Sequence, residues 1–197
     1  PPSLDPAAFL PILESALAAG PVAAFQLRMK PAAEADIREA VRLLMPVCHR
    51  HDAAFLLNDS PALALELGCD GAHIGRDDGS VRAARDMLKD KMLGVSCYDS
   101  LDRAMTAGEA GADYVAFGSF YPTATKENAS PARLETLENW TLGSEIPAVA
   151  IGGVTPDNAA PLVRAGAHFL AVSSGVWQYT SGPARAVRAF HEVMASL

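Results

Sequence analysis

Short apolar runs of strand length alternate with longer segments of helical period from one end of this chain to the other. The apolar runs do not alternate polar with apolar residues, which is typical of strands covered on both faces. Helices between successive buried strands imply right-handed crossovers and a parallel sheet. The predicted strands span residues 22–27, 53–57, 71–74, 91–95, 113–117, 147–151 and 168–172. The predicted helices span residues 4–19, 32–48, 61–67, 79–89, 99–110, 130–142, 156–165 and 183–196.

The number of predicted elements, seven strands and eight helices, leaves two architectures open. One is an open, doubly wound sheet, although no Gly-x-Gly-x-x-Gly fingerprint follows the first predicted strand. The other is an eight-fold β/α barrel whose first strand precedes this sequence, since the chain opens on a helix that should follow a strand. Such barrels typically have roughly 200 to 250 residues. The 197 residues here lie at the lower edge of that size, and we expect residues 1–197 to form one domain.

Charge and cysteine content narrow the function classes. The chain carries 16 Lys and Arg against 23 Asp and Glu, a formal charge of −7, without a basic cluster. Nucleic-acid binding is therefore not expected, because it depends on clustered Lys and Arg. Cys48, Cys69 and Cys97 form no CxxC pair and are expected to be reduced and buried. Without a membrane-spanning apolar stretch or a signal peptide, we expect a soluble, cytoplasmic protein that has small-molecule substrates and no membrane partner.

The first predicted strand ends in a polar cluster of Gln26, Arg28 and Lys30. In a β/α barrel the active site lies at the carboxyl ends of the strands. Because alternate residues of a strand share a side, these three side chains are expected to point into one space. Two cations and an amide in one space predict an anion there, and a solvated strand end is the alternative.

Carboxylates follow the second and third predicted strands. Asn58 and Asp59 follow the second, and Asp77 and Asp78 lie shortly after the third, beyond His73. Carboxylates from two strand ends can hold Mg²⁺, which prefers one or two carboxylates together with phosphate oxygens. The alternative is that Asp59 and Asp78 cap the helices that follow them. His73 by itself is expected to be a hydrogen-bonded histidine of the core or of the barrel mouth.

A long loop follows the fifth predicted strand. It runs from Gly118 to Lys126 and includes Thr123 and Thr125. Long loops of barrels are usually functional, and this one offers hydroxyls, backbone N–H groups and a cation to a phosphorylated ligand. A surface loop without a function is the alternative.

Glycines and serines follow the last two predicted strands. Gly152 and Gly153 follow the sixth strand, and Ser173, Ser174 and Gly175 follow the seventh. The loops after the final two strands of a barrel commonly bind phosphate, using glycines for close approach and a helix N-terminus for its dipole. A phosphate site is therefore predicted here, which requires the seventh predicted strand to be the eighth of a barrel.

Six short motifs at these strand ends, taken together, resemble one family. They are Gln-Leu-Arg-x-Lys, Asn-Asp, His-Ile-Gly-x-Asp-Asp, Gly-Val-Ser, Asp-Tyr-Val-Ala-Phe-Gly with Pro-Thr-x-Thr-Lys, and Ile-Gly-Gly-Val. In this order, over about residues 20–175, they resemble thiamine-phosphate synthases and their thiazole tautomerase relatives. The resemblance implies a TIM (β/α)8 barrel whose first strand is absent from this sequence. It also implies coupling of hydroxymethylpyrimidine diphosphate with thiazole phosphate, which gives thiamine phosphate and diphosphate.

The resemblance further implies a role for each matching residue. Asp59 and Asp78 resemble the ligands of Mg²⁺, the implied cofactor. Arg28, Ser96 and Lys126 resemble the catalytic groups that act on the leaving diphosphate. The residues that resemble substrate contacts are Gln26, Arg28, Lys30, Asn58, Ser96, Thr123, Thr125, Lys126, Gly153, Ser173 and Ser174. A homodimer is expected from the family alone.

Two positions depart from the family pattern. Arg76 stands where relatives usually have Gln, so it either pairs with Asp77 and leaves Asp78 available, or displaces the metal. Tyr98 stands where relatives often have His, which weakens a tautomerase interpretation. Two alternatives to a synthase stay open. One is a thiazole-phosphate isomerase or tautomerase that uses only the C-terminal phosphate site, and the other is a paralogue that binds thiamine precursors without turnover.

Overall fold

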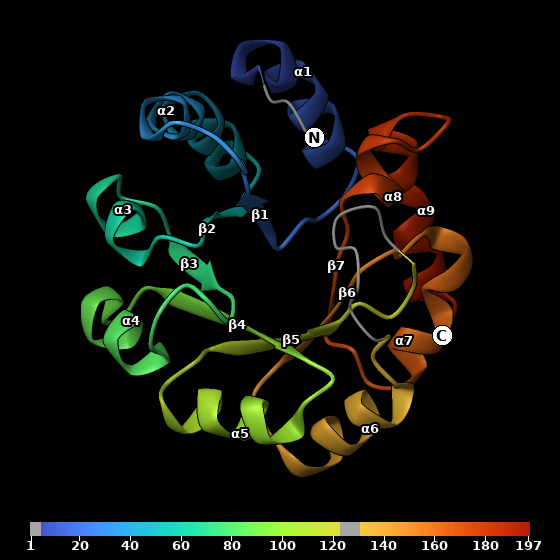
Figure 1. Cartoon of the computed structure of the whole chain (residues 1–197). Helices are drawn as coiled ribbons and strands as arrows, with labels where there is room; N and C mark the ends of the chain where they lie inside the picture. Colours follow the sequence, from blue (N-terminus) through green and yellow to red (C-terminus); the bar gives the residue numbers. More distant parts are fainter. Residues whose placement is uncertain (1–4, 123–130) are drawn as a thin grey trace.

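The predicted strands form one parallel sheet in the computed structural model, which describes residues 5–122 and 131–197. Each strand pairs with the next along the chain, so the sheet order is β1 to β7 (Figure 1). The strands are β1 (Ala24–Leu27), β2 (Ala54–Asn58), β3 (Gly71–Ile74), β4 (Met92–Tyr98), β5 (Tyr114–Gly118), β6 (Ala148–Ile151) and β7 (Phe169–Ala171). The helices of the described residues are α1 (Pro6–Leu17), α2 (Glu34–Arg50), α3 (Pro61–Glu66), α4 (Val81–Leu88), α5 (Leu101–Glu109), α6 (Leu134–Gly143), the 3-10 turn η1 (Pro156–Asn158), α7 (Ala160–Arg164), α8 (Ser174–Trp177) and α9 (Pro183–Ala195).

Local sequence explains where several helices begin. At the start of α1 the Asp5 carboxylate accepts hydrogen bonds from the backbone N–H groups of Ala7 and Ala8. At the start of α3 the Ser60 hydroxyl accepts one from Leu63 N. A proline follows each capping residue, where its fixed φ suits the first turn and its missing N–H costs nothing.

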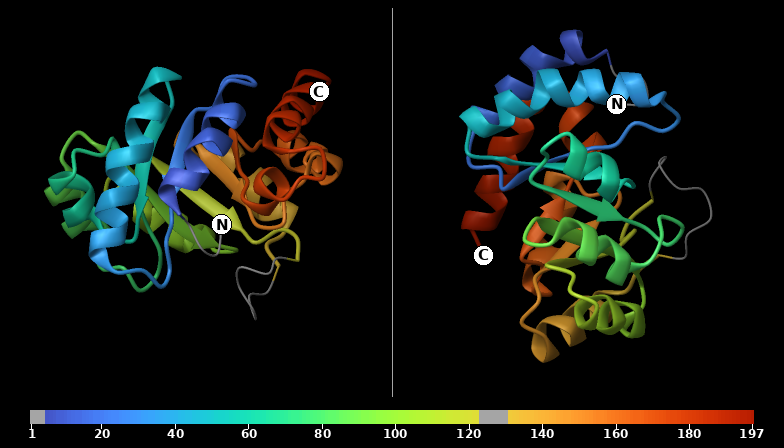
Figure 2. Two further views of the ribbon diagram at one scale, coloured as in Figure 1. Left: turned by 90° about the horizontal axis from the view of Figure 1, so that it is seen from above. Right: turned by 90° about the vertical axis from the view of Figure 1, so that its left-hand side faces the viewer.

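The helices form a ring around the outside of the curved sheet (Figures 1 and 2). Consecutive residues of β3 and β5 are buried, so side chains are covered on both faces of the sheet. This double coverage explains why the strands read as continuous apolar runs. Each large apolar side chain that is fully buried contributes about 1.5–3 kcal/mol. The largest fully buried side chains include Leu13, Leu44, Phe55, Ile74, Leu88, Leu93, Val95, Val115, Phe117, Leu137 and Leu162.

The two edge strands of the sheet, β1 and β7, face each other across what we call the seam. Within the described residues the pairing runs from β1 to β7 and does not join β7 back to β1. The helices do close across the seam, because α1 packs against both α2 and α9 (Figures 1 and 2). Phe9, Phe25 and Trp177 gather there, with ring centroids 5.0 to 6.2 Å apart. The predicted TIM-like α/β fold is thus confirmed with seven parallel strands.

The structure differs from the predicted helices at two places. The helix predicted over residues 156–165 is broken into η1 and α7, because Thr155 and Asn158 form a reciprocal capping box around η1. The segment after β7, expected to be a loop, contains the short helix α8. Its four residues are too few to show a helical period in the sequence.

The three cysteines lie in the core, as predicted. Burial raises the pKa of the thiols of Cys48 and Cys97 to about 12 and that of Cys69 to about 11. They therefore act as small apolar side chains and not as nucleophiles. None of the helices in the described parts of the chain is both long enough and apolar enough to cross a membrane.

Candidate active site

Four of the predicted site residues form one polar chain at the carboxyl ends of β1 and β2. Gln26 Nε2 donates to Asn58 Oδ1 at 2.6 Å, and Asn58 Nδ2 donates to Asp59 Oδ1. Lys30 Nζ lies 2.6 Å from Asp59 Oδ2. These polar contacts run across β1 and β2, which pair in register, so the four side chains are held in fixed relative positions. Arg28 lies exposed just beyond β1.

Asp59 and Asp78 lie close together, next to the Lys30 ammonium. Lys30 Nζ is 2.6 Å from Asp59 Oδ2 and 4.0 Å from Asp78 Oδ1. Burial raises the pKa of Asp59, the Lys30 ammonium opposes this, and the neighbouring Asp78 carboxyl raises the pKa again. Two carboxylates that repel each other at the end of a sheet are stabilised by a cation between them.

The capping alternative for these two carboxylates is wrong. Ser60 caps α3, and the residue before α4 is Ser80. Asp78 Oδ2 instead accepts from Gly75 N at 2.7 Å within its own loop. Asp59 adopts φ +74°, a left-handed conformation in which Asn and Asp are enriched among residues other than glycine.

This donor pair fits Mg²⁺. The ion prefers hard oxygen ligands and commonly takes one or two carboxylates, completing its octahedron with water and phosphate oxygens. Across residues 5–122 and 131–197 there is no group of three or more His, Cys, Asp or Glu side chains that could hold a metal. A metal ion at Asp59 and Asp78 would therefore need further oxygens, from water or a phosphorylated ligand, beyond the side chains that the structure describes.

Arg76 occupies neither of the places that the sequence suggested. Its guanidinium lies over the Tyr98 ring, 4.8 Å from the centroid, and the Arg103 guanidinium lies 5.8 Å from the same centroid. Arg103 Nε also donates to Ser96 O at 2.8 Å. Arg76 is thus held by a cation–π contact instead of pairing with Asp77, which leaves Asp78 to Gly75 and Lys30.

Ser96 is held by a histidine that the sequence did not single out as functional. His73 Nε2 lies 2.9 Å from Ser96 Oγ, and His73 Nδ1 lies 3.0 Å from the Tyr114 hydroxyl. His73 is 6% exposed and Ser96 is 8% exposed. His73 is the hydrogen-bonded histidine that the sequence predicted.

The loop after β6 approaches the loops after β5 and β7 through its backbone. Gly153 has φ +66°, and a Cβ there would lie 2.5 Å from Pro122 O in the loop after β5. A Cβ on Gly175, in the loop after β7, would lie 2.2 Å from Val154 O, so glycine is needed at both contacts. Ser173 and Ser174 lie exposed at the start of α8. Thr123, Thr125 and Lys126 lie outside the described residues.

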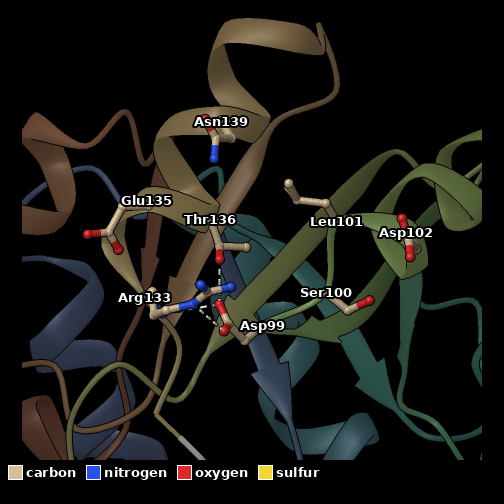
Figure 3. Close-up of a pocket in the computed structure, with 8 residues that line it drawn as sticks. All are labelled: Asp99, Ser100, Leu101, Asp102, Arg133, Glu135, Thr136 and Asn139. Atoms are coloured by element: carbon tan, nitrogen blue, oxygen red, sulfur yellow. Dashed lines mark hydrogen bonds and ion pairs between the residues drawn. The ribbon is translucent and has the colours of Figure 1, made fainter.

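A small polar pocket of about 280 Å³ lies between the starts of α5 and α6. In Figure 3 Arg133 and Thr136 point toward the Asp99 carboxylate. Asp99 accepts from Thr136 Oγ1 at 2.5 Å, from Arg133 Nε at 2.9 Å and from Arg133 N at 3.1 Å. Asp99 therefore fastens the start of α6 to the end of β4. The sequence shows a polar residue at each place but not their contact.

The fold and these strand ends define a TIM-like α/β protein whose polar side chains gather at the carboxyl ends of its strands. The chain matches the family model described as thiamine monophosphate synthase over residues 1–176. It is 52% identical over 195 residues to a thiamine-phosphate synthase of Rhodospirillum centenum, covering 98% of this chain and 94% of that protein. It therefore belongs to the thiamine monophosphate synthase family.

Two further comparisons agree. A thiamine-phosphate synthase of Hyphomonas neptunium is 50% identical over 206 residues, covering 100% of this chain and 92% of that protein. The solved thiamine phosphate pyrophosphorylase from Pyrococcus furiosus superposes with a TM-score of 0.86 at 29% identity, covering 95% of this chain and 89% of that one.

Proposed function

We propose that this chain couples hydroxymethylpyrimidine diphosphate with thiazole phosphate, releasing thiamine phosphate and diphosphate. Its membership of the family and its identity to thiamine-phosphate synthases support this reaction. The observation that carries the proposal is the cluster of Gln26, Lys30, Asn58, Asp59 and Asp78, because a diphosphate with a divalent cation needs this mixture of donors, cations and carboxylates. The chain would accordingly act as a transferase in thiamine biosynthesis.

The chemical task is to stabilise a departing diphosphate. The bond between the pyrimidine methylene carbon and a diphosphate oxygen breaks, and the thiazole nitrogen bonds to that carbon. Negative charge develops on the diphosphate as it leaves, so preorganised donors and cations lower the barrier. We assign this role to Arg28, Ser96 and Lys126, while Gln26, Lys30 and Asn58 hold the substrate.

We assign Asp59 and Asp78 as the ligands of Mg²⁺, which when bound neutralises charge on the diphosphate. Lys30 is well placed to act with them, because its half-exposed ammonium already lies against both carboxylates. Its positive charge keeps the unloaded carboxylates from repelling each other.

We assign the thiazole phosphate to the other end of the strand-end face. Gly153 would offer its backbone N–H to the phosphate, and Ser173 and Ser174 would offer hydroxyls. Thr123 and Thr125 complete this set of predicted contacts. The support is the close backbone approach of the loop after β6 to the loop after β5 at Gly153 and to the loop after β7 at Gly175, which glycine alone permits.

The direct test supplies both phosphorylated precursors with Mg²⁺ and follows diphosphate release. Release that requires both precursors and stops when a chelator removes Mg²⁺ is the expected result. Binding of thiazole phosphate without any release would contradict the proposal and favour the paralogue that binds precursors without turnover. The position of Arg76 over Tyr98 supports the synthase over such a paralogue, because Asp59 and Asp78 form their ion pairs with Lys30 and not with Arg76.

We also propose that the sheet closes as a (β/α)8 barrel through one further short strand between β1 and β7. The side chain of Phe169 on β7 is exposed, and β1 and β7 are the edges of the sheet within the described residues. A strand in the seam would cover both edges. Organisation of residues 1–197 as one domain, a homodimer and a cytoplasmic location stay predictions.

A further inference from the structure

Three residues on neighbouring strands stand in one row across the sheet. His73 of β3 pairs in register with Gly94 of β4, and Gly94 pairs in register with Tyr114 of β5. The rings of His73 and Tyr114 stack over the glycine, with centroids 5.6 Å apart and planes at 29°. The middle residue of the row, Gly94, has no side chain, so the two flanking rings meet there.

Gly94 is what permits this contact. A Cβ built on Gly94 would lie 2.0 Å from Tyr114 Cζ and 2.2 Å from its hydroxyl oxygen. Glycine inside a strand weakens it, and its usual justification is a close approach by another group. Here the approaching group is the Tyr114 ring, whose hydroxyl reaches His73 Nδ1 at 3.0 Å.

The row continues to a residue of the proposed active site. His73 Nε2 lies 2.9 Å from Ser96 Oγ, so Tyr114, His73 and Ser96 form one chain of hydrogen bonds. A neutral imidazole carries one proton, and the proton on one nitrogen makes the other an acceptor. The direction of these hydrogen bonds therefore decides whether His73 Nε2 donates to Ser96 Oγ or accepts from it.

We propose that Tyr114 and His73 are positioning residues that make Ser96 a hydrogen-bond donor to the leaving diphosphate. Tyr114 donates its hydroxyl proton to His73 Nδ1, the imidazole proton resides on Nε2, and Nε2–H donates to Ser96 Oγ. The Ser96 hydroxyl proton then points to the ligand instead of to His73. This inference rests on the proposed function, in which Ser96 contacts the diphosphate.

The chemistry of the two hydroxyls fixes this direction. A phenol is a stronger hydrogen-bond donor and a weaker acceptor than an aliphatic hydroxyl, because a lone pair of its oxygen is delocalised into the ring. Burial raises the pKa of the Tyr114 hydroxyl, so the phenol keeps its proton at neutral pH. The phenol is thus the natural donor at one end of the imidazole, and Ser96 Oγ is the natural acceptor at the other.

The tautomer of His73 can be read directly. Long-range ¹H–¹⁵N correlation spectra of the whole protein with ¹⁵N-labelled histidine distinguish protonated from unprotonated ring nitrogens. His73→Gln identifies the His73 signals among those of the five histidines. We expect a proton on Nε2 and none on Nδ1. A proton on Nδ1 would overturn the proposal.

Tyr114→Phe removes the donor and keeps the ring. We expect the two tautomers of His73 to mix and kcat to fall about tenfold, the value of one hydrogen bond, with less than about a twofold change in KM for thiazole phosphate. Tyr121→Phe is the matched control, because it removes another partly buried hydroxyl, which donates to Asn158 O at 2.7 Å. The control should leave the His73 spectrum unchanged. An unchanged tautomer and kcat in Tyr114→Phe would contradict the proposal.

Two more variants separate positioning from packing. His73→Gln keeps an N–H near the place of Nε2, so it should retain at least about tenfold more activity than His73→Leu. Gly94→Ala should displace Tyr114 and mix the tautomers as Tyr114→Phe does. Equal activity in the Gln and Leu variants would contradict the proposal that His73 orients the Ser96 hydroxyl.

The tautomer is measured without substrate, so the two proposals fail separately. A chain with Nε2–H that releases no diphosphate contradicts only the proposed function. A protein that releases diphosphate but carries the His73 proton on Nδ1 contradicts only the proposed orientation of Ser96.

Discussion

The strand-end face has two unlike halves. At the ends of β1 to β4 the functional groups are side chains, and they hold one another through ion pairs and hydrogen bonds, as Lys30 holds Asp59 and His73 holds Ser96. At the ends of β5 to β7 the loops approach one another through their backbones. Glycines lie where the loops touch, and exposed serines lie beside them. We call these the side-chain half and the backbone half.

Under the proposed function, the difference corresponds to two kinds of anion. A diphosphate that leaves during the reaction gains charge, and cations, carboxylates with a metal and an oriented hydroxyl can respond to it. A phosphate monoester that only anchors its substrate keeps its charge, so N–H groups in fixed positions suffice. Mutations in the side-chain half should therefore lower kcat, and those in the backbone half should raise KM. Lys126, which follows β5, is the exception, because we assign it to the departing diphosphate.

The largest effect is expected for Asp59 and Asp78, the proposed metal ligands. Asp59→Asn or Asp78→Asn should reduce kcat at least about 100-fold, because each removes half of the proposed protein ligands to Mg²⁺. Isothermal titration with Mg²⁺ and the diphosphate substrate, beside turnover, measures this. Asp77→Asn is the control, since Asp77 is exposed one residue away. Equal losses in the control would show that the effect is not one of ligation.

The next largest effect is expected at Lys126. Lys126→Ala should lower kcat about 100-fold while the affinity for thiazole phosphate changes little, because its charge acts on the departing diphosphate. Steady-state kinetics with each substrate varied in turn separates the two. Similar losses in turnover and affinity would assign Lys126 to binding.

An intermediate effect tests the backbone half. Gly153→Ala should raise KM for thiazole phosphate about tenfold with little change in kcat, since a Cβ would press on Pro122 O and the residue has positive φ. Gly143→Ala is the control, because nothing lies within 4 Å of its added Cβ. A fall in kcat without a rise in KM would contradict the proposed difference between the two halves.

A smaller effect is expected where the halves join, at Asp99. Burial raises the pKa of Asp99, but the hydrogen bonds from Thr136 and Arg133 outweigh it and hold the pKa below its ordinary value. This stabilisation is present above the ordinary Asp pKa of about 3.9 and is lost as pH falls through the lower folded value. Asp99→Asn should cost about 1 kcal/mol at pH 7, and less in acid. Urea unfolding at both pH values measures it, and a cost that does not shrink in acid would contradict the assignment.

The smallest effect is expected at Arg76. Arg76→Gln should change turnover by less than about threefold, because the loss is one partly exposed cation–π contact with Tyr98. The same diphosphate assay measures it. A large gain would mean that Arg76 competes with the metal after all.

The strands, and the gathering of polar residues at their carboxyl ends, were predictable because they depend on local pattern. Buried runs identify strands, and parallel strands bring their carboxyl ends to one face, so Lys30 and Asp59 could be expected together. Contacts that depend on register could not be foreseen. Gly94 reads as a weak point in a strand until its pairing with His73 and Tyr114 is known. Likewise, only the three-dimensional structure puts Arg76 on Tyr98.

The contact between α1 and α9 bears on how the chain folds as it is synthesised. The buried face of α1 carries Phe9, Leu13 and Leu17, and α1 packs against a helix that begins at Pro183. Because synthesis runs from the N-terminus, the ribosome makes α1 before the long segment that separates it from α9, and it makes α9 only after that segment. Such contacts between distant segments form late and slowly. The apolar face of α1 that meets α9 therefore remains open to chaperones while nearly all of the intervening chain is made.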